Sequence, residues 1–261
     1  MKIAVTGKGG VGKTTVSSIL ARLYADEGRK VLAADVDPDA NLGLALGFTP
    51  AEVDQIVPLS QQRELIQERT GAQPGTFAKF FKMNPRVDDI PDLYAKEKYG
   101  VKLLILGTVK TAGSGCVCPE NVLLKQIISH LLLQNDEVVV LDMEAGLEHL
   151  GRGTTDCVDR FIVVVEPGSR SVQTYHSVKR LAEELGIKQV DVVANKIVSE
   201  DDEAFIRESI PAEALLGMIH IDEAVRDADR QGKTPYGASE RTMAEIRAIK
   251  QRIDTAWHNA E

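Results

Sequence analysis

A short apolar run, a glycine-rich loop and an amphipathic helix pattern follow one another at the start of the chain. The loop reads Gly-Lys-Gly-Gly-Val-Gly-Lys-Thr-Thr over residues 7–15, and the apolar run before it covers residues 3–5. This order fits G-x-x-x-x-G-K-[ST], the pattern of a phosphate-binding loop between a strand and a helix. A glycine-rich turn with an exposed lysine is the alternative, but it leaves Lys-Thr-Thr at the helix start unexplained. The sequence therefore predicts a nucleotide-binding fold.

The chemistry of the loop residues suggests how each would contact a nucleotide. Glycines let backbone N–H groups turn toward phosphate, and the helix that follows points its positive end at the same place. Lys13 is expected to reach the β- and γ-phosphates, and the Thr14 hydroxyl is expected to bind Mg²⁺. The predicted phosphate site consists of Gly9, Gly10, Val11, Gly12, Lys13, Thr14 and Thr15.

Apolar runs of strand length recur along the chain. They are continuous rather than alternating, which is typical of strands covered on both faces. Helical patterns fill many of the gaps, as over residues 172–185, where Gly186 follows as a stop signal. We therefore predict one α/β domain over residues 1–261, with a doubly wound, mostly parallel sheet of about seven strands and helices on both faces. The expected strands are residues 3–5, 31–34, 101–106, 138–141, 161–165, 190–194 and 215–219.

One segment, residues 49–99, is less regular and carries five prolines and three of the six phenylalanines. Such a segment can dock a partner or cover a nucleotide. Aromatic clusters pack more often on their own domain, and we favour that interpretation here.

Composition excludes several classes of function. The net charge is −8, from 31 basic and 39 acidic residues, which argues against sequence-independent binding of nucleic acid. No apolar run approaches the length of a membrane span, so no membrane insertion is expected, and the N-terminus lacks a signal peptide's apolar core. Three cysteines do not form a disulfide framework. A reducing, cytoplasmic location is expected.

Polar side chains follow the expected strands at the sheet edge where ligands of such folds collect. Asp35, Asp37 and Asp39 follow the second strand, and Asp142 ends the fourth. A carboxylate here can orient an attacking water and help to hold hydrated Mg²⁺. Asn195 follows the sixth strand, and its amide can both donate to and accept from a purine edge.

The second lysine of the loop, Lys8, makes the loop resemble the deviant Walker A motif of the MinD, ParA and nitrogenase iron-protein group of ATPases. The resemblance implies an ATP-dependent homodimer in which Lys8 touches the partner subunit's nucleotide. The simpler alternative is a solvated surface lysine.

The same resemblance assigns further roles. Asp37 matches the switch I aspartate, leaving Asp35 and Asp39 as solvated or capping residues. Asp142 begins Asp-Met-Glu-Ala-Gly over 142–146, which is similar to switch II. The resemblance implies that Asn195 reads adenine. ATP is preferred over GTP because Lys196 is not followed by x-Asp, and the loop at 220–222 is expected to close over the base.

Cys116 and Cys118 are separated by one residue and precede Pro119, a favourable first residue of a helix. A helix N-terminus favours the thiolate, which is a ligand for soft or borderline metals. Two cysteines cannot complete a tetrahedral S₄ site, but two copies of the chain can. The alternative is a pair of buried apolar cysteines, which the glycines at 113 and 115 disfavour. Cys157 is interpreted as structural.

The motifs together resemble the CooC-type nickel-insertion ATPases that mature carbon monoxide dehydrogenase. The matching segments are Val-Thr-Gly-Lys-Gly-Gly-Val-Gly-Lys-Thr-Thr at 5–15, Cys-Val-Cys-Pro at 116–119 and Val-Val-Val-Glu-Pro-Gly at 163–168. The resemblance implies Ni²⁺ (or Zn²⁺) on the shared cysteines. It also implies a client apoenzyme, carbon monoxide dehydrogenase or its acetyl-CoA synthase counterpart.

Two other functions remain open. An electron-transferring iron–sulfur ATPase would carry one of its cysteines in switch II, where this chain has Ala145, although four shared thiolates also suit a cluster. A MinD- or ParA-like positioning switch would not explain the two cysteines. We interpret the apolar stripe of the last helix as a surface packed on the sheet rather than bound to a membrane. This stripe consists of Met243, Ile246, Ile249, Ile253 and Trp257.

Overall fold

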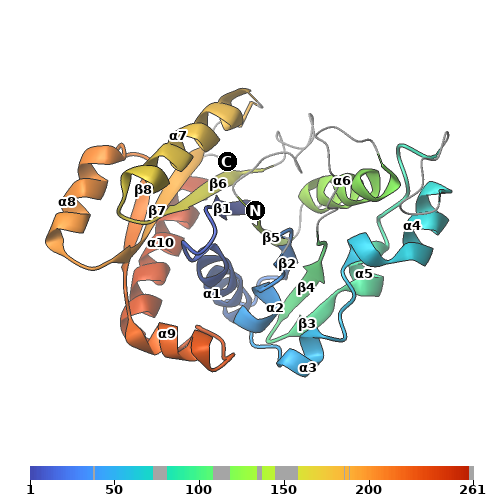
Figure 1. Cartoon of the computed structure of the whole chain (residues 1–261), viewed down its shortest axis with the longest axis horizontal. Coiled ribbons are helices and arrows are strands. Elements are labelled where there is room, and N and C mark those ends of the chain that lie inside the picture. The colour runs from blue at the N-terminus through green and yellow to red at the C-terminus, as the bar shows by residue number, and fades with distance from the viewer. Residues whose placement is uncertain are drawn as a thin grey trace.

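A sheet of eight strands runs through the molecule in the order β3-β4-β2-β5-β1-β6-β7-β8 (Figure 1). The computed structural model describes residues 1–37, 39–72, 81–107, 118–133, 137–144, 158–184, 186–187 and 189–258. All neighbouring strands are parallel except β3 and β4. The strands are β1 (Lys2–Gly7), β2 (Val31–Asp35), β3 (Lys96–Lys98), β4 (Val101–Ile105), β5 (Val138–Asp142), β6 (Arg160–Val165), β7 (Val190–Ile197) and β8 (Leu215–His220).

The strand order reverses around β1, which lies between β5 and β6. From β1 the chain crosses to β2 on one side, and β6, β7 and β8 extend the sheet on the other. Ligands of doubly wound sheets bind beyond the carboxyl ends of the strands at such a reversal. The glycine-rich loop leaves β1 at this point, so topology alone places it in a ligand-binding position.

Strand β3 is the one strand that the sequence pattern did not predict. It consists of Lys-Glu-Lys, pairs antiparallel with β4 and lies at the edge of the sheet. Its three charged side chains, of which only Lys98 is partly buried, give no apolar signal, although charges are common on edge strands. Tyr99 and Gly100 form the turn to β4 with φ angles of 52° and 74°.

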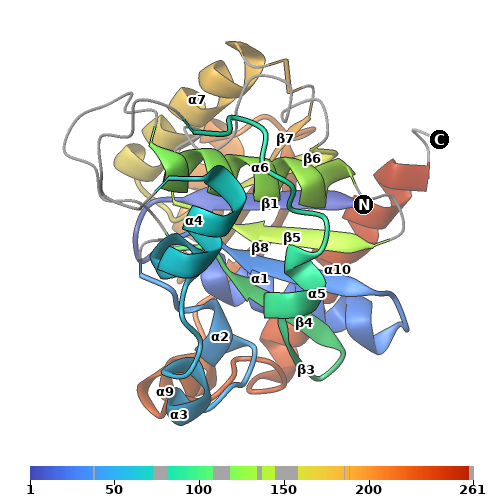
Figure 2. The ribbon, with the colours of Figure 1, turned by 90° about the vertical axis from the view of Figure 1, so that its right-hand side faces the viewer.

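Helices α1 (Lys13–Asp26) and α10 (Glu240–His258) cover one face of the sheet (Figures 1 and 2). The apolar stripe of α10 packs into the same core cluster as Ile3 and Val5 of β1, with Trp257 partly buried at its margin. The prediction that this stripe packs on the sheet is therefore confirmed.

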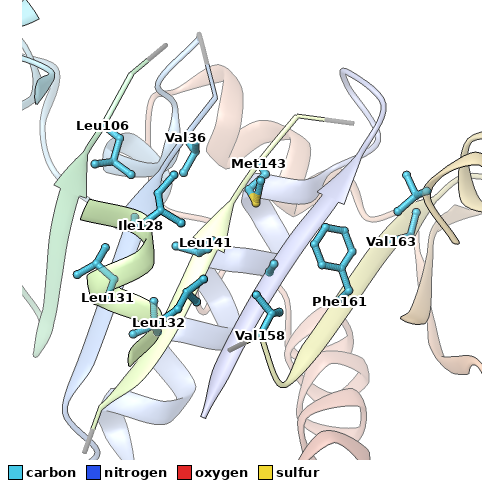
Figure 3. Packing of buried hydrophobic residues seen from close by; sticks show 14 of the residues in the cluster. Val36, Leu106, Ile128, Leu131, Leu132, Leu141, Met143, Val158, Phe161 and Val163 are labelled. Atoms are coloured by element: carbon cyan, nitrogen blue, oxygen red, sulfur yellow. The ribbon is translucent and has the colours of Figure 1, made fainter. Parts of the chain in front are cut away.

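Helices α4 (Arg63–Thr70), α6 (Pro119–Leu133) and α7 (Ser169–Glu184) cover the opposite face (Figure 2). Figure 3 shows Ile128 and Leu131 of α6 beside Leu141 of β5, with Phe161 of β6 in the same cluster. The strand residues of β1 alternate between the two clusters, since Ala4 belongs to this one and Ile3 to the other. Both faces of the sheet are buried, as the continuous apolar runs predict.

Short elements build the less regular segment and the remaining connections. Phe81 is partly buried, whereas Phe77 and Phe80 lie outside the described residues. Within the described ranges, no helix is both long and apolar enough for a bilayer crossing. The short elements of the less regular segment and of the remaining connections are α2 (Leu42–Ala45), α3 (Pro50–Val53), η1 (Leu59–Gln61), α5 (Ile90–Tyr94), α8 (Glu200–Ser209) and α9 (Glu223–Arg230).

Candidate nucleotide-binding site

Two glycines, Gly7 at the end of β1 and Gly12 directly before α1, occupy positions where a side chain would force a neighbouring group to move. A Cβ atom on Gly7 would lie 2.5 Å from the Val164 carbonyl oxygen, and one on Gly12 would lie 2.2 Å from Nδ2 of Asn195. Gly12 also has a φ of 97°, in the left-handed region that glycine adopts without a steric penalty. The loop therefore approaches β6 and β7 closely, which fixes its path over the sheet edge.

Lys13 is the first residue of α1, and its side chain is buried in the loop. Its Nζ lies 3.3 Å from the Lys8 carbonyl oxygen and 3.5 Å from Oδ2 of Asp37. The ammonium group is thus held where the loop and the end of β2 meet. Lys8 differs from Lys13 because its side chain is exposed.

Asp142, at the end of β5, is completely buried and accepts hydrogen bonds from two hydroxyl groups of α1. Oγ1 of Thr14 donates to it at 2.7 Å and Oγ of Ser17 at 3.0 Å. Burial raises the pKa of Asp142 to about 6, although both hydroxyl contacts and Lys13 oppose the shift. A hydroxyl and a carboxylate side by side are the oxygen ligands that Mg²⁺ prefers, so these residues fit a magnesium site. Ser17 is a site residue that the loop motif does not include, although its place one turn after Thr14 puts it on the same helix face.

Asp35 is a buried capping residue rather than a solvated one. Its two carboxyl oxygens accept the backbone N–H groups of Asp37 at 3.1 Å and Leu42 at 2.9 Å, which shapes the turn after β2. Burial, followed by the nearby charge of Asp142, raises the pKa of Asp35 to about 8. Asp39 is exposed and donates its backbone N–H to Oδ1 of Asp37 at 3.0 Å.

Two side chains at the end of β7 donate hydrogen bonds to carbonyl groups of the phosphate-binding loop. Nδ2 of Asn195 donates to the Val11 carbonyl at 2.8 Å, and Nζ of Lys196 donates to the Gly10 carbonyl at 2.6 Å. The motif predicts that Asn195 contacts the purine base, and nothing in it indicates that the same amide also holds the loop. Lys196 belongs to that prediction only as part of the base-reading motif.

These elements surround a cleft of about 790 Å³, which is large enough for a nucleotide. Val11 is buried beneath the loop and Lys8 lies outside the cleft lining. The loop after β8, expected over the base, also lines the cleft, together with Val225 and Arg226 of α9. The predicted site residues that line it are Gly9, Gly10, Gly12, Lys13, Thr14, Thr15, Asp37 and Asn195.

Of the cysteines, only Cys118 falls within the described residues. It is partly exposed and directly precedes α6, and its carbonyl accepts the Val122 N–H at 3.1 Å in the first turn. Cys116, Cys157 and the switch II residues Ala145 and Gly146 lie outside that part of the chain. In the described ranges, no group of three or more His, Cys, Asp or Glu side chains is arranged to hold a metal ion.

The parallel sheet, the glycine-rich loop on β1 and the acidic residues behind it define a P-loop nucleotide-binding protein. Residues 2–236 match the CobQ/CobB/MinD/ParA nucleotide binding domain, and the chain belongs to this family. With its ATP-binding relatives, it is an ATPase.

Two relatives cover nearly the whole chain. The carbon monoxide dehydrogenase accessory protein CooC of Rhodospirillum rubrum is 46% identical over 257 residues, which span 97% of each chain. An uncharacterised ATP-binding protein of Methanocaldococcus jannaschii is 46% identical over 252 residues, 95% of this chain and 96% of its own.

Solved structures agree on the fold. The MinC:MinD cell division complex of Aquifex aeolicus matches with a TM-score of 0.66 at 19% identity, over 98% of this chain and 96% of that one. The MinD protein of Pyrococcus horikoshii in complex with Mg-ADP matches with a TM-score of 0.62 at 20% identity, again over 98% and 96%. At these identities the comparison concerns the fold alone.

Proposed function

We propose that this ATPase delivers a metal ion to a nickel enzyme. In this proposal an ATP-dependent homodimer holds Ni²⁺ (or Zn²⁺) on Cys116 and Cys118 of both subunits. It then assists insertion of nickel into the Ni–Fe–S cluster of carbon monoxide dehydrogenase or acetyl-CoA synthase. The observation that carries the proposal is the 46% identity, over 97% of both chains, to a protein named for carbon monoxide dehydrogenase.

The hydrolytic part of the proposal rests on the geometry of the cleft. Lys13 is held where the phosphates of ATP would lie, and Oδ2 of Asp37, which also lines the cleft, lies 3.5 Å from its Nζ. From there the Asp37 carboxylate can orient a water for attack on the γ-phosphorus. Mg²⁺, held by Thr14 with Asp142 behind it, would neutralise charge on the phosphate oxygens.

The dimeric part rests on the contrast between the two loop lysines. Lys13 is buried in its own loop, whereas Lys8 projects an exposed side chain from the same loop. An exposed ammonium beside a phosphate site can reach a nucleotide bound to a second chain. Binding of ATP would then hold two subunits together, and hydrolysis would loosen them.

The metal-binding part rests on the position of Cys118 at the start of α6. The helix N-terminus stabilises a thiolate there, and pairing two chains would bring four such sulfurs to one tetrahedral site. Coupling to ATP requires that the metal binds the ATP-bound and ADP-bound states with different affinities. Metal release would then follow from separation of the subunits.

The test is metal content and mass measured together. Protein prepared anaerobically is titrated with Ni²⁺ or Zn²⁺ in the presence of ADP or a slowly hydrolysed ATP analogue. We expect one metal per two chains with the ATP analogue, and no such binding in a Cys116→Ser/Cys118→Ser variant. Cys157→Ser serves as the matched control, because it removes a thiol that the proposal does not use.

Each alternative result identifies another function. Equal metal affinity with ADP and with ATP would contradict delivery driven by hydrolysis. Bound iron and sulfide on the same cysteines would indicate an electron-transferring ATPase. Nucleotide-dependent dimers without cysteine-dependent metal would indicate a positioning switch.

A further inference from the structure

We propose that Lys196 is a positioning residue for nucleotide binding, because it holds the phosphate-binding loop in its binding conformation through the Gly10 carbonyl. Its Nζ lies 2.6 Å from that oxygen. Lys13 and Asn195 belong to the expected machinery of the site, but Lys196 does not. This inference concerns the ATP site alone and is independent of metal delivery.

The backbone of β7 is distorted in a way that brings Lys196 to the loop. Successive side chains of a regular strand point to opposite faces, so Asn195 and Lys196 would not contact the same loop. The pairing of β7 with β8 shifts register between Ala194 and Ile197, and Lys196 has a φ of 60°. A lysine in this left-handed conformation is strained, and such strain concentrates at functional sites. Here its consequence is that two consecutive side chains contact adjacent carbonyls of one loop.

These contacts fix the orientation of two successive peptide groups. In a trans peptide the C=O and N–H bonds point in opposite directions. The Gly10 carbonyl is held by Lys196, and the N–H of the same peptide donates to the Lys8 carbonyl at 3.4 Å. The Val11 carbonyl is held by Asn195, so the Gly12 N–H points away from β7. A loop restrained by these contacts loses less conformational freedom when nucleotide binds, which lowers the entropic cost of binding.

Glu166 connects this arrangement to the loop after β6. Its Oε2 lies 3.5 Å from Nζ of Lys196, and its backbone N–H donates to Oγ of Ser171 at 3.0 Å. The two side chains of the ion pair are 43% and 46% exposed, so the pair itself contributes little. Its effect is to direct the lysine toward Gly10.

The experiment compares nucleotide affinity, steady-state hydrolysis and thermal stability in variants of the full chain. Lys196→Ala removes the side chain, Lys196→Gly removes it while relieving the strained φ, and Lys196→Arg keeps the charge and a donor. Lys125→Ala, an exposed lysine on α6, controls for the loss of one surface charge.

We expect Lys196→Ala and Lys196→Gly to raise the KM for ATP by about fivefold, which corresponds to about 1 kcal/mol. The affinity for ADP should fall by the same factor and kcat should change by less than about twofold, as for a loss of uniform binding. Lys196→Arg should recover most of the affinity, and Tm should stay near that of Lys125→Ala.

Three results would overturn the proposal. The first is a KM for Lys196→Ala close to that of the natural protein, with any loss of activity following a lower Tm. The second is a Lys196→Gly variant with normal affinity, which would assign the effect to the backbone. The third is weaker binding of ATP with unchanged binding of ADP, which would indicate direct contact with the γ-phosphate.

Discussion

Asp35 and Asp142 occupy paired positions at the carboxyl ends of the parallel strands β2 and β5, and both side chains are completely buried. Each is held by two donors: backbone N–H groups at Asp35 and the Thr14 and Ser17 hydroxyls at Asp142. Burial outweighs these contacts and raises both pKa values, to about 8 for Asp35 and about 6 for Asp142. The protein therefore carries a destabilising acidic pair beneath its phosphate-binding loop.

The stability of the nucleotide-free protein should fall as pH rises from 5 to 8. Asp35 has an ordinary pKa of 3.8 and a pKa of about 8 in the folded protein. Between these values the folded state binds a proton that the unfolded state has released, so each pH unit costs up to about 1.4 kcal/mol. Asp35→Asn should flatten this dependence, as measured by urea denaturation at several pH values.

The matched control for this experiment is Asp39→Asn, which changes an exposed carboxyl group in the same turn. It should keep the natural slope of unfolding free energy against pH. A natural slope in Asp35→Asn as well would mean that Asp35 is not the group responsible.

Asp142→Asn should slow hydrolysis without lowering the stability of the protein. The change neutralises a buried charge, so the nucleotide-free protein should be at least as stable near pH 8 as the natural one. Hydrolysis should fall by roughly 10²-fold, because the carboxylate behind Thr14 and the metal is lost. Ser17→Ala removes only one of the two hydroxyl donors and should lower the rate of hydrolysis by a few-fold. Steady-state hydrolysis at saturating Mg²⁺ tests this, and more than a tenth of normal activity in Asp142→Asn would refute it.

Gly12 and Gly28 provide a matched pair for the shape of the loop. Both have positive φ angles, 97° and 78°, but only Gly12 has a neighbour where a Cβ would lie, Nδ2 of Asn195 at 2.2 Å. Gly28→Ala should therefore cost about 1–2 kcal/mol of stability from backbone strain alone and leave nucleotide affinity unchanged. Gly12→Ala should displace Asn195 and reduce ADP affinity more than about tenfold. Calorimetric titration with ADP measures the affinity of each variant and urea denaturation measures its stability. Equal ADP affinities in the two variants would show that the close contact is not important.

The sequence predicts the parallel sheet, the loop on β1 and the acidic strand ends because each has a local signature. Buried strands appear as continuous apolar runs, and the phosphate-binding loop has a recognisable motif of consecutive residues, Gly12-Lys13-Thr14. Edge strand β3 has no such signature, since it consists of three charged residues that pair with β4 through the main chain. The motif alone predicts that Asp35 is either solvated or capping, because the burial of Asp35 depends on the packing of β2 between β4 and β5.

The contacts of β7 with the loop could not be predicted for a different reason. Asn195 and Lys196 are separated from Gly10 and Val11 by most of the chain, and the contacts depend on a register shift in β7. A regular strand would separate the two side chains. The sequence therefore predicts which residues lie at this site better than it predicts the hydrogen bonds between them.

Arg160 and Asp191 form a buried ion pair between the neighbouring strands β6 and β7. Nε2 of Gln189 also donates to Asp191 at 2.6 Å. Removing one partner leaves a buried charge without compensation, so Arg160→Met should cost about 3–5 kcal/mol in unfolding free energy. The double variant Arg160→Met/Asp191→Leu should recover much of this loss. Urea denaturation measures the cycle, and additive losses in the double variant would contradict coupling between the two charges.

In the proposed homodimer, Lys8 and Lys13 should act on the nucleotides of different subunits. Lys13→Ala removes a buried ammonium from its own loop and should abolish tight nucleotide binding. Lys8→Ala removes an exposed one and should leave ADP binding intact while preventing hydrolysis, if Lys8 acts on the partner. Mixing inactive variants tests this, since a Lys8→Ala subunit can receive Lys8 from an Asp142→Asn subunit. Random pairing makes half of the dimers mixed with one competent site each, so about a quarter of normal activity should return. A mixture as inactive as its components would place the action of Lys8 within its own chain.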